Sequence, residues 1–211
     1  MQPLNITELS NLSKTIPLAK QENIINDWII AADRKSLTQD LLSSPEIIKK
    51  SQEYYLTLPE QMAIRHYTDN GYAALNAVLN KSHSFGNQTD TIERKGGDLL
   101  RQALDKLPNY NDVVVFSRQD LPVTFLDKIL KLDDVRFLAF LSANVGYDLR
   151  SFRKHRLIIE SRTGKHIAWI SANSDTEDEV LFKDSTWFTV DSIEYMPNAE
   201  IWFYLSEMDY D

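Results

Sequence analysis

The hydrophobic pattern of the chain changes its period once, between Leu107 and Asp112. Before this point, apolar residues recur three and four positions apart, which is the spacing of an amphipathic helix. After it, the apolar residues form short runs rich in β-branched and aromatic side chains, which favour strands. Helices that precede strands, rather than alternate with them, are typical of the α+β class. We therefore expect N-terminal helices followed by a mixed or antiparallel β core.

Local signals locate the ends of several predicted helices. The segment Ser44-Pro45-Glu46 combines an N-cap residue, a first-turn proline and a first-turn acid. Thr57 and Glu60 have the T-x-x-E spacing of a capping box, so a further helix is predicted to start there. Both signals support a helical first half.

The second half predicts one short helix, over residues 124–132, and a set of strands. The sequence around Gly164 predicts a hairpin between the strands 157–161 and 166–170. Gly96 and Gly97 match neither of the common glycine-rich nucleotide-binding motifs, and we expect them to break a helix. The predicted strands are 113–117, 137–142, 157–161, 166–170, 179–182, 187–190 and 201–205.

Composition limits the classes of function. The chain has 211 residues, 43% of them hydrophobic, which suits one packed domain. Acidic residues outnumber basic ones 31 to 23, which disfavours a nucleic-acid partner. Cysteine is absent and the four histidines lack metal-ligand spacing, so we expect no disulfide and no metal. No signal peptide and no apolar run of roughly 20 residues is visible, so we expect a soluble protein without a membrane span.

Three consecutive acids, Glu177, Asp178 and Glu179, stand at the entrance of a predicted strand. On a strand, Glu177 and Glu179 would project to the same face, roughly 7 Å apart. Such a pair can divide labour, because one carboxylate can stabilise a developing cation while the other orients or deprotonates a nucleophile. A solvated acidic turn is the alternative, since acidic triplets are common on protein surfaces.

Other polar candidates lie at the ends of predicted strands. Arg118 follows the strand 113–117, where its guanidinium could fork onto a phosphate or carboxylate, or simply open a surface loop. Ser142 and Asn144 could hydrogen-bond a sugar or cap a turn. The basic residues between 150 and 156 are interpreted as a solvated face, with contact to an anion as the alternative.

In their order, these residues resemble the arginine-specific mono-ADP-ribosyltransferases of bacterial toxins and effectors, which share an Arg, Ser, Glu-x-Glu constellation. The likeness runs from about Leu56 to Leu205. It begins with LPEQMAIRHYTDNGY at 58–72 and continues through the segment 113–122 and FLSAN at 140–144. Its most specific part is the final section, residues 161–190, with SRTGKHI, EDEVLF and WFTV.

The resemblance implies an enzyme that transfers ADP-ribose from NAD to an arginine side chain of a target protein and releases nicotinamide. NAD would be the co-substrate, bound in a cleft between two small perpendicular sheets. Arg118 would anchor the NAD phosphates, and Ser142 would hold the nicotinamide ribose and orient the catalytic glutamate. Glu179 would bond the ribose 2′-hydroxyl and stabilise the oxocarbenium-like cation. Glu177 would orient or activate the acceptor guanidinium, and Tyr67 would line the adenine side.

Some positions depart from the family pattern. The family usually has Tyr-Arg-Gly, whose glycine backbone holds the nicotinamide amide, whereas this chain has Phe-Ser-Arg-Gln, with Gln119 in the glycine's place. The register of the arginine is therefore open by one residue. Asn144 replaces the last serine of Ser-Thr-Ser, and Phe152 or Tyr147 is assigned to stack on nicotinamide. Two alternatives stand beside transfer: an NAD glycohydrolase, with water as acceptor, and a binding module that has lost catalysis.

The first 55 residues lie outside the resemblance. We expect residues 1–55 to form a helical extension and residues 56–211 to form the catalytic domain, as one compact unit. Packing as an extra helical layer, recognition of the target, and binding of a chaperone or immunity protein are three alternatives for the extension. A toxin or effector of this group would be a secreted virulence factor, here delivered into a target cell without a cleavable signal peptide.

Overall fold

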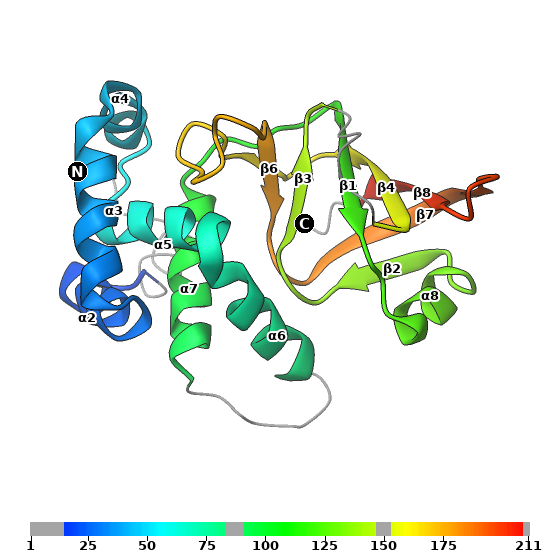
Figure 1. Ribbon diagram of the computed structural model, residues 1–211, viewed down its shortest axis with the longest axis horizontal. Coiled ribbons are helices and arrows are strands. Elements are labelled where there is room, and N and C mark those ends of the chain that lie inside the picture. Colours follow the sequence, from blue (N-terminus) through cyan, green and yellow to red (C-terminus); the bar gives the residue numbers. More distant parts are fainter. Residues whose placement is uncertain (1–14, 83–90, 147–152, 209–211) are drawn as a thin grey trace, which may run out of the picture.

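The architecture is that of an α+β protein, as the change of period predicts. The computed structural model describes residues 15–82, 91–146 and 153–208. The helices are α2 (Leu18–Trp28), α3 (Ala31–Ser43), α4 (Pro45–Glu53), α5 (Leu58–His66), the π-helix η1 (Tyr67–Gly71), α6 (Tyr72–Ser82), α7 (Ile92–Asp105) and α8 (Val123–Ile129). The strands are β1 (Val113–Gln119), β2 (Asp134–Phe137), β3 (Leu141–Asn144), β4 (His155–Ser161), β5 (Lys165–His166), β6 (Glu179–Phe182), β7 (Thr186–Tyr195) and β8 (Ile201–Glu207). Helices α2 to α7 gather on one side of the strands, and α8 lies beside β2 (Figure 1).

The predicted helix starts are confirmed by hydrogen bonds at the first turns. The Ser44 hydroxyl accepts from the backbone N–H of Ile47 at the start of α4. At α5 the capping box is complete: Thr57 Oγ1 accepts from Glu60 N–H at 3.3 Å, and Glu60 Oε2 accepts from Thr57 N–H at 2.8 Å. These caps supply partners for N–H groups that a helix cannot satisfy internally.

The strands form one continuous eight-stranded order, β2-β7-β8-β4-β1-β3-β6-β5. The pair β4–β8 is parallel and the other pairs are antiparallel. The ladder narrows to a single register pair, Phe116 with Asn144, where β1 meets β3. The mixed, mainly antiparallel β core is as predicted, but its two parts are joined at this pair rather than forming two separate sheets.

The predicted strand 137–142 is wrong, because the chain breaks there into two strands. β2 ends at Phe137 and pairs with β7, while β3 starts at Leu141 and pairs with β6 and β1. Between them, the carbonyl of Phe140 accepts from the side-chain amide of Asn76 at 3.2 Å, from helix α6. A contact with the helical layer therefore replaces a strand partner at this point.

The predicted hairpin around Gly164 is also wrong. β4 pairs with β1 and β8, and the two-residue strand β5 pairs with β6. The buried carboxylate of Glu207 accepts from the backbone N–H groups of Arg162 and Thr163, and the carbonyl of Gly164 accepts from Tyr110 N–H. These bonds lead the chain away from β4 instead of folding it back along that strand.

Gly96 and Gly97 do not break a helix, since both lie inside α7. A Cβ built on Gly96 would lie 2.4 Å from the Trp28 ring, whereas one on Gly97 would lie 3.1 Å from a methyl of Leu75. Gly96 therefore serves the close approach of α2 to α7, a reason that local sequence does not reveal.

Two hydrophobic cores lie on opposite faces of β3 and β6. The helices share one core with Leu181 of β6, and Val180 and Phe182 belong to the core among the strands. Because consecutive strand residues point to opposite faces, Glu179 shares the helix-side face of β6 with Leu181. Ser142 of β3 is paired with Leu181 and faces the same side. The polar candidates of these strands therefore face the helical layer.

Candidate active site

A cavity of about 990 Å³ lies between the helical layer and the strands. Its lining residues come from η1 and α6 of the helical layer, from the strands β1, β3 and β6, and from α8. The sequence-predicted residues that line it are Tyr67, Arg118, Gln119, Ser142, Asn144, Glu177 and Glu179. Positions that are far apart in the chain are thus brought to one site. Tyr147 and Phe152, assigned to nicotinamide, lie outside the described residues.

Glu179 is a buried carboxylate, with 3% of its surface exposed. The hydroxyl of Ser142 donates to Oε1 at 2.7 Å, and the hydroxyl of Ser171 donates to Oε2 at 2.8 Å. Burial raises the pKa of Glu179 above its usual value, the two hydroxyl donors act against that shift, and the charge of Glu177 adds to it. The result is a fixed carboxylate at the cavity wall, well suited to stabilise a cation that forms beside it.

The strand pairing explains why Ser142 reaches Glu179. β3 and β6 are antiparallel, with Asn144 opposite Glu179 and Ser142 opposite Leu181. Ser142 and Asn144 are two residues apart and therefore share one face, while Ala143 between them is buried in the other core. The alternation of polar and apolar residues in this short strand thus presents the serine hydroxyl to the glutamate.

Arg118 lies on the same face of the sheet. Phe116, two residues earlier in β1, pairs with Asn144 of β3, so the strand alternation turns Arg118 toward the cavity. Arg118 Nη2 is 3.5 Å from Glu200 Oε1, and Arg118 Nε is buried without a hydrogen-bond partner among the described residues. An uncompensated buried donor of this kind is suited to an anionic ligand.

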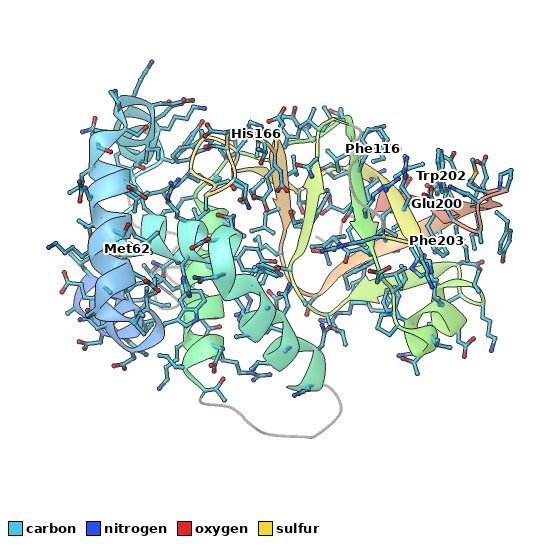
Figure 2. All side chains as sticks on the ribbon, in the orientation of Figure 1. Met62, Phe116, His166, Glu200, Trp202 and Phe203 are labelled. Carbon is cyan, nitrogen blue, oxygen red and sulfur yellow. The ribbon has the colours of Figure 1, made fainter. Side chains whose placement is uncertain are left out.

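Arg156 joins Arg118 at this end of the cavity. The two residues are opposite one another in the β1–β4 register, and Arg156 also lies 3.8 Å from Glu200. The Arg156 guanidinium stacks 4.6 Å from the ring centroid of Trp202, which lies beside Glu200 near the β7–β8 hairpin (Figure 2). Two largely buried guanidinium groups thus lie close to the carboxylate of Glu200 at this end of the cavity.

Gln119 lies on the opposite face of β1 from Arg118. Its side-chain amide donates to the Ser117 hydroxyl at 2.9 Å, and that hydroxyl donates to the carbonyl of Ser142 at 2.6 Å. Gln119 also lines the cavity, at the end of β1, but its side-chain amide is already engaged by Ser117. This chain of bonds ties the end of β1 to β3 beside the single register pair that joins them.

Tyr67 is almost completely buried at the boundary between η1 and β3. Its hydroxyl donates to the carbonyl of Phe140 and accepts from Asn76 Nδ2, and its ring packs 5.4 Å from that of Phe140. Burial raises the pKa of the Tyr67 phenol above its usual value. Tyr67 therefore braces the wall of the cavity as well as lining it.

The strand β6 has the bounds predicted for it, 179–182, so Glu177 lies outside it and does not project from a strand beside Glu179. β6 begins at Glu179, and the backbone N–H of Glu177 donates to the carbonyl of Asn173 in a turn. The side chain of Glu177 is exposed, whereas that of Glu179 is buried, although both residues line the cavity. The pair thus differs in environment, with one carboxylate at the wall and the other toward solvent.

Sequence reasoning missed the roles of two residues. Ser171 belongs to the polar loop before the acids, but no spacing marked its bond to Glu179. Arg156 fell within the basic segment interpreted as a solvated face, yet it is 2% exposed and lines the cavity. Sequence alone does not distinguish the buried Arg156 from its basic neighbours, because the distinction depends on the strand register.

Within the described parts of the chain, no helix is long and apolar enough to cross a membrane. In the same residues, no three His, Cys, Asp or Glu side chains gather as a metal ion would require.

Comparison with solved structures identifies the fold. The type III effector XopAI from Xanthomonas axonopodis pv. citri is 21% identical, with a TM-score of 0.63 over 83% of this chain and 71% of that one. ADP-ribosyltransferase HopU1 of Pseudomonas syringae pv. Tomato is 14% identical, with a TM-score of 0.70 over 83% and 87%. ADP-ribosyltransferase Vis of Vibrio splendidus, solved with agmatine, is 19% identical, with a TM-score of 0.58 over 79% and 86%. Among curated protein sequences, none matches significantly.

The helices, the mixed sheet and the cavity with its serine-bound glutamate define an ADP-ribosyltransferase fold. The family model described as ADP-ribosyltransferase exoenzyme matches residues 44–200, most of the chain. The protein therefore belongs to the ADP-ribosyltransferase exoenzyme family, whose co-substrate is NAD.

Proposed function

We propose that this protein transfers ADP-ribose from NAD to an arginine side chain of a target protein. The observation that carries this proposal is the pair of glutamates on one cavity, with Glu179 buried and held by Ser142 and Ser171, and Glu177 exposed two residues earlier. The guanidino compound agmatine in the Vis structure gives further support, because it presents the same chemical group as an arginine acceptor.

The reaction breaks the bond between the ribose C1′ and the nicotinamide nitrogen, and the bonding electron pair leaves with nicotinamide. Positive charge develops on the ribose, and the Glu179 carboxylate stabilises it most strongly when that charge is fully formed. A nitrogen lone pair of the acceptor guanidinium forms the new bond to C1′, and the guanidinium loses one proton. Arginine is protonated at neutral pH, so the nearby Glu177 carboxylate is needed to orient it and accept that proton.

The position of Arg118 in the cavity wall supports a role for this residue in binding the NAD pyrophosphate. The unpartnered Nε of Arg118 and its fork geometry suit phosphate oxygens. In this proposal Ser142 holds the ribose side and keeps Glu179 in place. Gln119 and Tyr67 act as wall residues of the NAD site rather than as reacting groups.

Substitution of the buried glutamate tests the bond-breaking step. Glu179→Gln keeps the side-chain size but removes the charge, so we expect nicotinamide release to fall by about 10²- to 10³-fold. The assay is nicotinamide release from NAD by the purified protein, with and without agmatine. Release within a few-fold of the wild type would contradict the assigned role.

Substitution of the exposed glutamate separates transfer from hydrolysis. We expect Glu177→Gln to lower agmatine modification by about 10²-fold or more while nicotinamide release to water persists, because Glu177 serves the acceptor. Asp178→Asn is the matched control, since Asp178 faces His166 and does not line the cavity. Equal loss of both reactions in Glu177→Gln would argue against a role at the acceptor.

An NAD glycohydrolase is the second candidate, favoured by the exposure of Glu177 to solvent. Release of nicotinamide without modification of agmatine or of any lysate protein would establish it. We also propose that residues 56–211 form the catalytic unit and that the protein acts as an effector delivered into a target cell. The type III effector XopAI, which shares the fold, supports this proposal.

A further inference from the structure

The segment that carries Glu177 and leads into Glu179 is fastened to the helical layer. The polar residues 171–178, here called the glutamate loop, run from Ser171 to the start of β6. Arg65, on α5, donates from Nη1 to the carbonyl of Ser171 at 3.0 Å. Helix α5 continues directly into the π-helix η1. Such π-helical turns are rare and are concentrated at functional sites.

Thr68 of η1 makes two contacts with the glutamate loop. Its hydroxyl accepts from the backbone N–H of Ala172 at 2.9 Å and donates to the carbonyl of Arg65 at 3.0 Å. Its own carbonyl accepts from the side-chain amide of Asn173 at 2.9 Å. Thr68 is 6% exposed, so its hydroxyl bonds are largely shielded from competing water. The residue therefore determines where the first part of the loop lies.

Asn173 carries this attachment onward to Glu177. The carbonyl of Asn173 accepts from the backbone N–H groups of Thr176 and Glu177, each at 2.9 Å. The backbone of Glu177 is thus placed by Asn173, and Asn173 is placed by Thr68. Glu179 lies differently, because it is paired in β6 and is held by Ser142 as well as by Ser171. The backbone of Ser171 has anchors of its own, since its carbonyl accepts from Arg65 and its N–H donates to the carbonyl of Ile167. A disturbance at Thr68 should therefore move Glu177 while leaving Glu179 near its position.

We propose that Thr68 and Asn173 are positioning residues that fix Glu177 for the acceptor guanidinium. This inference rests on the proposed function and adds that the acceptor end of the site is set from the helical layer. Positioning errors of about 1 Å are enough to lower a rate by about 10²-fold. A change confined to the acceptor end should appear in transfer and not in hydrolysis.

The test compares two reactions of the purified full chain, nicotinamide release to water and modification of agmatine. Thr68→Val keeps the shape of the side chain and removes both hydroxyl bonds. We expect it to lower agmatine modification by at least about tenfold, with nicotinamide release and the KM for NAD within about threefold of wild type. Thr68→Ser restores the hydroxyl, and we expect it to restore transfer. Thr38→Val, whose hydroxyl donates to Arg34 within its own helix, is the matched control.

Asn173→Ala provides an independent variant should Thr68→Val fail to fold, because it removes only the exposed side chain that binds Thr68. We expect the same selective loss of transfer. Equal falls in transfer and hydrolysis, or an unchanged ratio of the two, would overturn this inference while leaving the wild-type activity intact. A wild-type protein that modifies no acceptor would instead overturn the proposed function, and this inference with it.

Discussion

The burial of the Glu179 carboxylate in the active site lowers the stability of the folded protein when this group is ionised. Its carboxyl is buried, and burial raises its pKa despite the donors Ser142 and Ser171. The folded state therefore holds the proton more tightly than the unfolded chain does. The stability that this gives is complete below the unfolded pKa of about 4.3, and it is lost as the pH rises through the folded pKa. The folded protein is therefore less stable when Glu179 is ionised, although catalysis requires the ionised form.

The raised pKa of Glu179 gives a prediction for stability. Glu179→Gln should raise the melting temperature at pH 7, because it removes a buried charge, and should raise it less at pH 4, where the carboxyl is protonated in both states. Thermal unfolding at the two pH values measures the difference. Glu177→Gln, at an exposed position, is the control. A Glu179→Gln variant less stable than wild type at pH 7 would mean that its hydrogen bonds outweigh burial.

The same network predicts the pH dependence of catalysis. Nicotinamide release should fall as the pH drops through the folded pKa of Glu179, because the protonated carboxyl no longer stabilises the ribose cation. Ser171→Ala removes a donor that lowers this pKa, so the acid limb of the pH–rate profile should move to higher pH. A profile measured from pH 4 to pH 8 tests this. An unmoved acid limb would show that another group titrates.

At the scale of elements, local signals succeeded and non-local ones did not. The capping box at Thr57 and Glu60 is written in four adjacent residues, and it formed as predicted. The strand 137–142 and the hairpin at Gly164 failed, because their outcomes depend on Asn76 and Glu207, which contact them from distant parts of the chain. The hydrophobic periodicity of a segment predicts which of its side chains are buried, but it does not predict which strand will pair with that segment.

The site follows the same division. The order of Arg118, Ser142 and Glu179 could be recognised from sequence, because it resembles the pattern of a known family. The contacts of Ser171 and Thr68 could not. The first arises only when the glutamate loop folds against Glu179 of β6, and the second only when the loop meets the π-helix. Polar residues in a loop carry no periodic mark that separates such partners from solvated neighbours.

The glycines of α7 give a prediction at this scale. Alanine is the better helix former by about 1 kcal/mol, yet Gly96→Ala should destabilise the protein, because its Cβ would overlap the Trp28 ring. Overpacking of this kind costs about 1–3 kcal/mol. Gly97→Ala, which meets only a Leu75 methyl at 3.1 Å, is the control and should be nearly neutral. Chemical denaturation measures both. Equal stabilities for the two variants would show that α2 shifts to accommodate the methyl.

At the scale of the whole molecule, the N-terminal helices are packed into the main helical core. Ile24, Ile25 and Leu41, from α2 and α3, share one hydrophobic cluster with Leu99 and Leu100 of α7. The family model begins at residue 44, beyond both of these helices. Helices α2 and α3, which lie within the extension proposed for residues 1–55, therefore contribute buried side chains to the core of the helical layer.

Removal of this layer is a prediction for the molecule as a whole. A chain starting at residue 44 would lose several buried aliphatic side chains, each contributing about 1.5–3 kcal/mol. Their sum approaches the whole stability of a typical domain, about 5–15 kcal/mol. We therefore expect the fragment 44–211 to lack a cooperative thermal transition by circular dichroism. A fragment melting within a few degrees of the full chain would show instead that the helices are a separable module.

The single residue pair between β1 and β3 has a consequence for the local opening of the sheet. β1 is laddered to β4 over seven pairs and β3 to β6 over four, so the contact of Phe116 with Asn144 is the thinnest point of the β order. Openings that break few bonds begin at such points. Amide protons beside the contact between β1 and β3 should exchange with solvent sooner than those in the β1–β4 and β3–β6 ladders. A dinucleotide that touches both sides would slow that exchange, so NAD would act as a clamp across the sheet as well as a reactant.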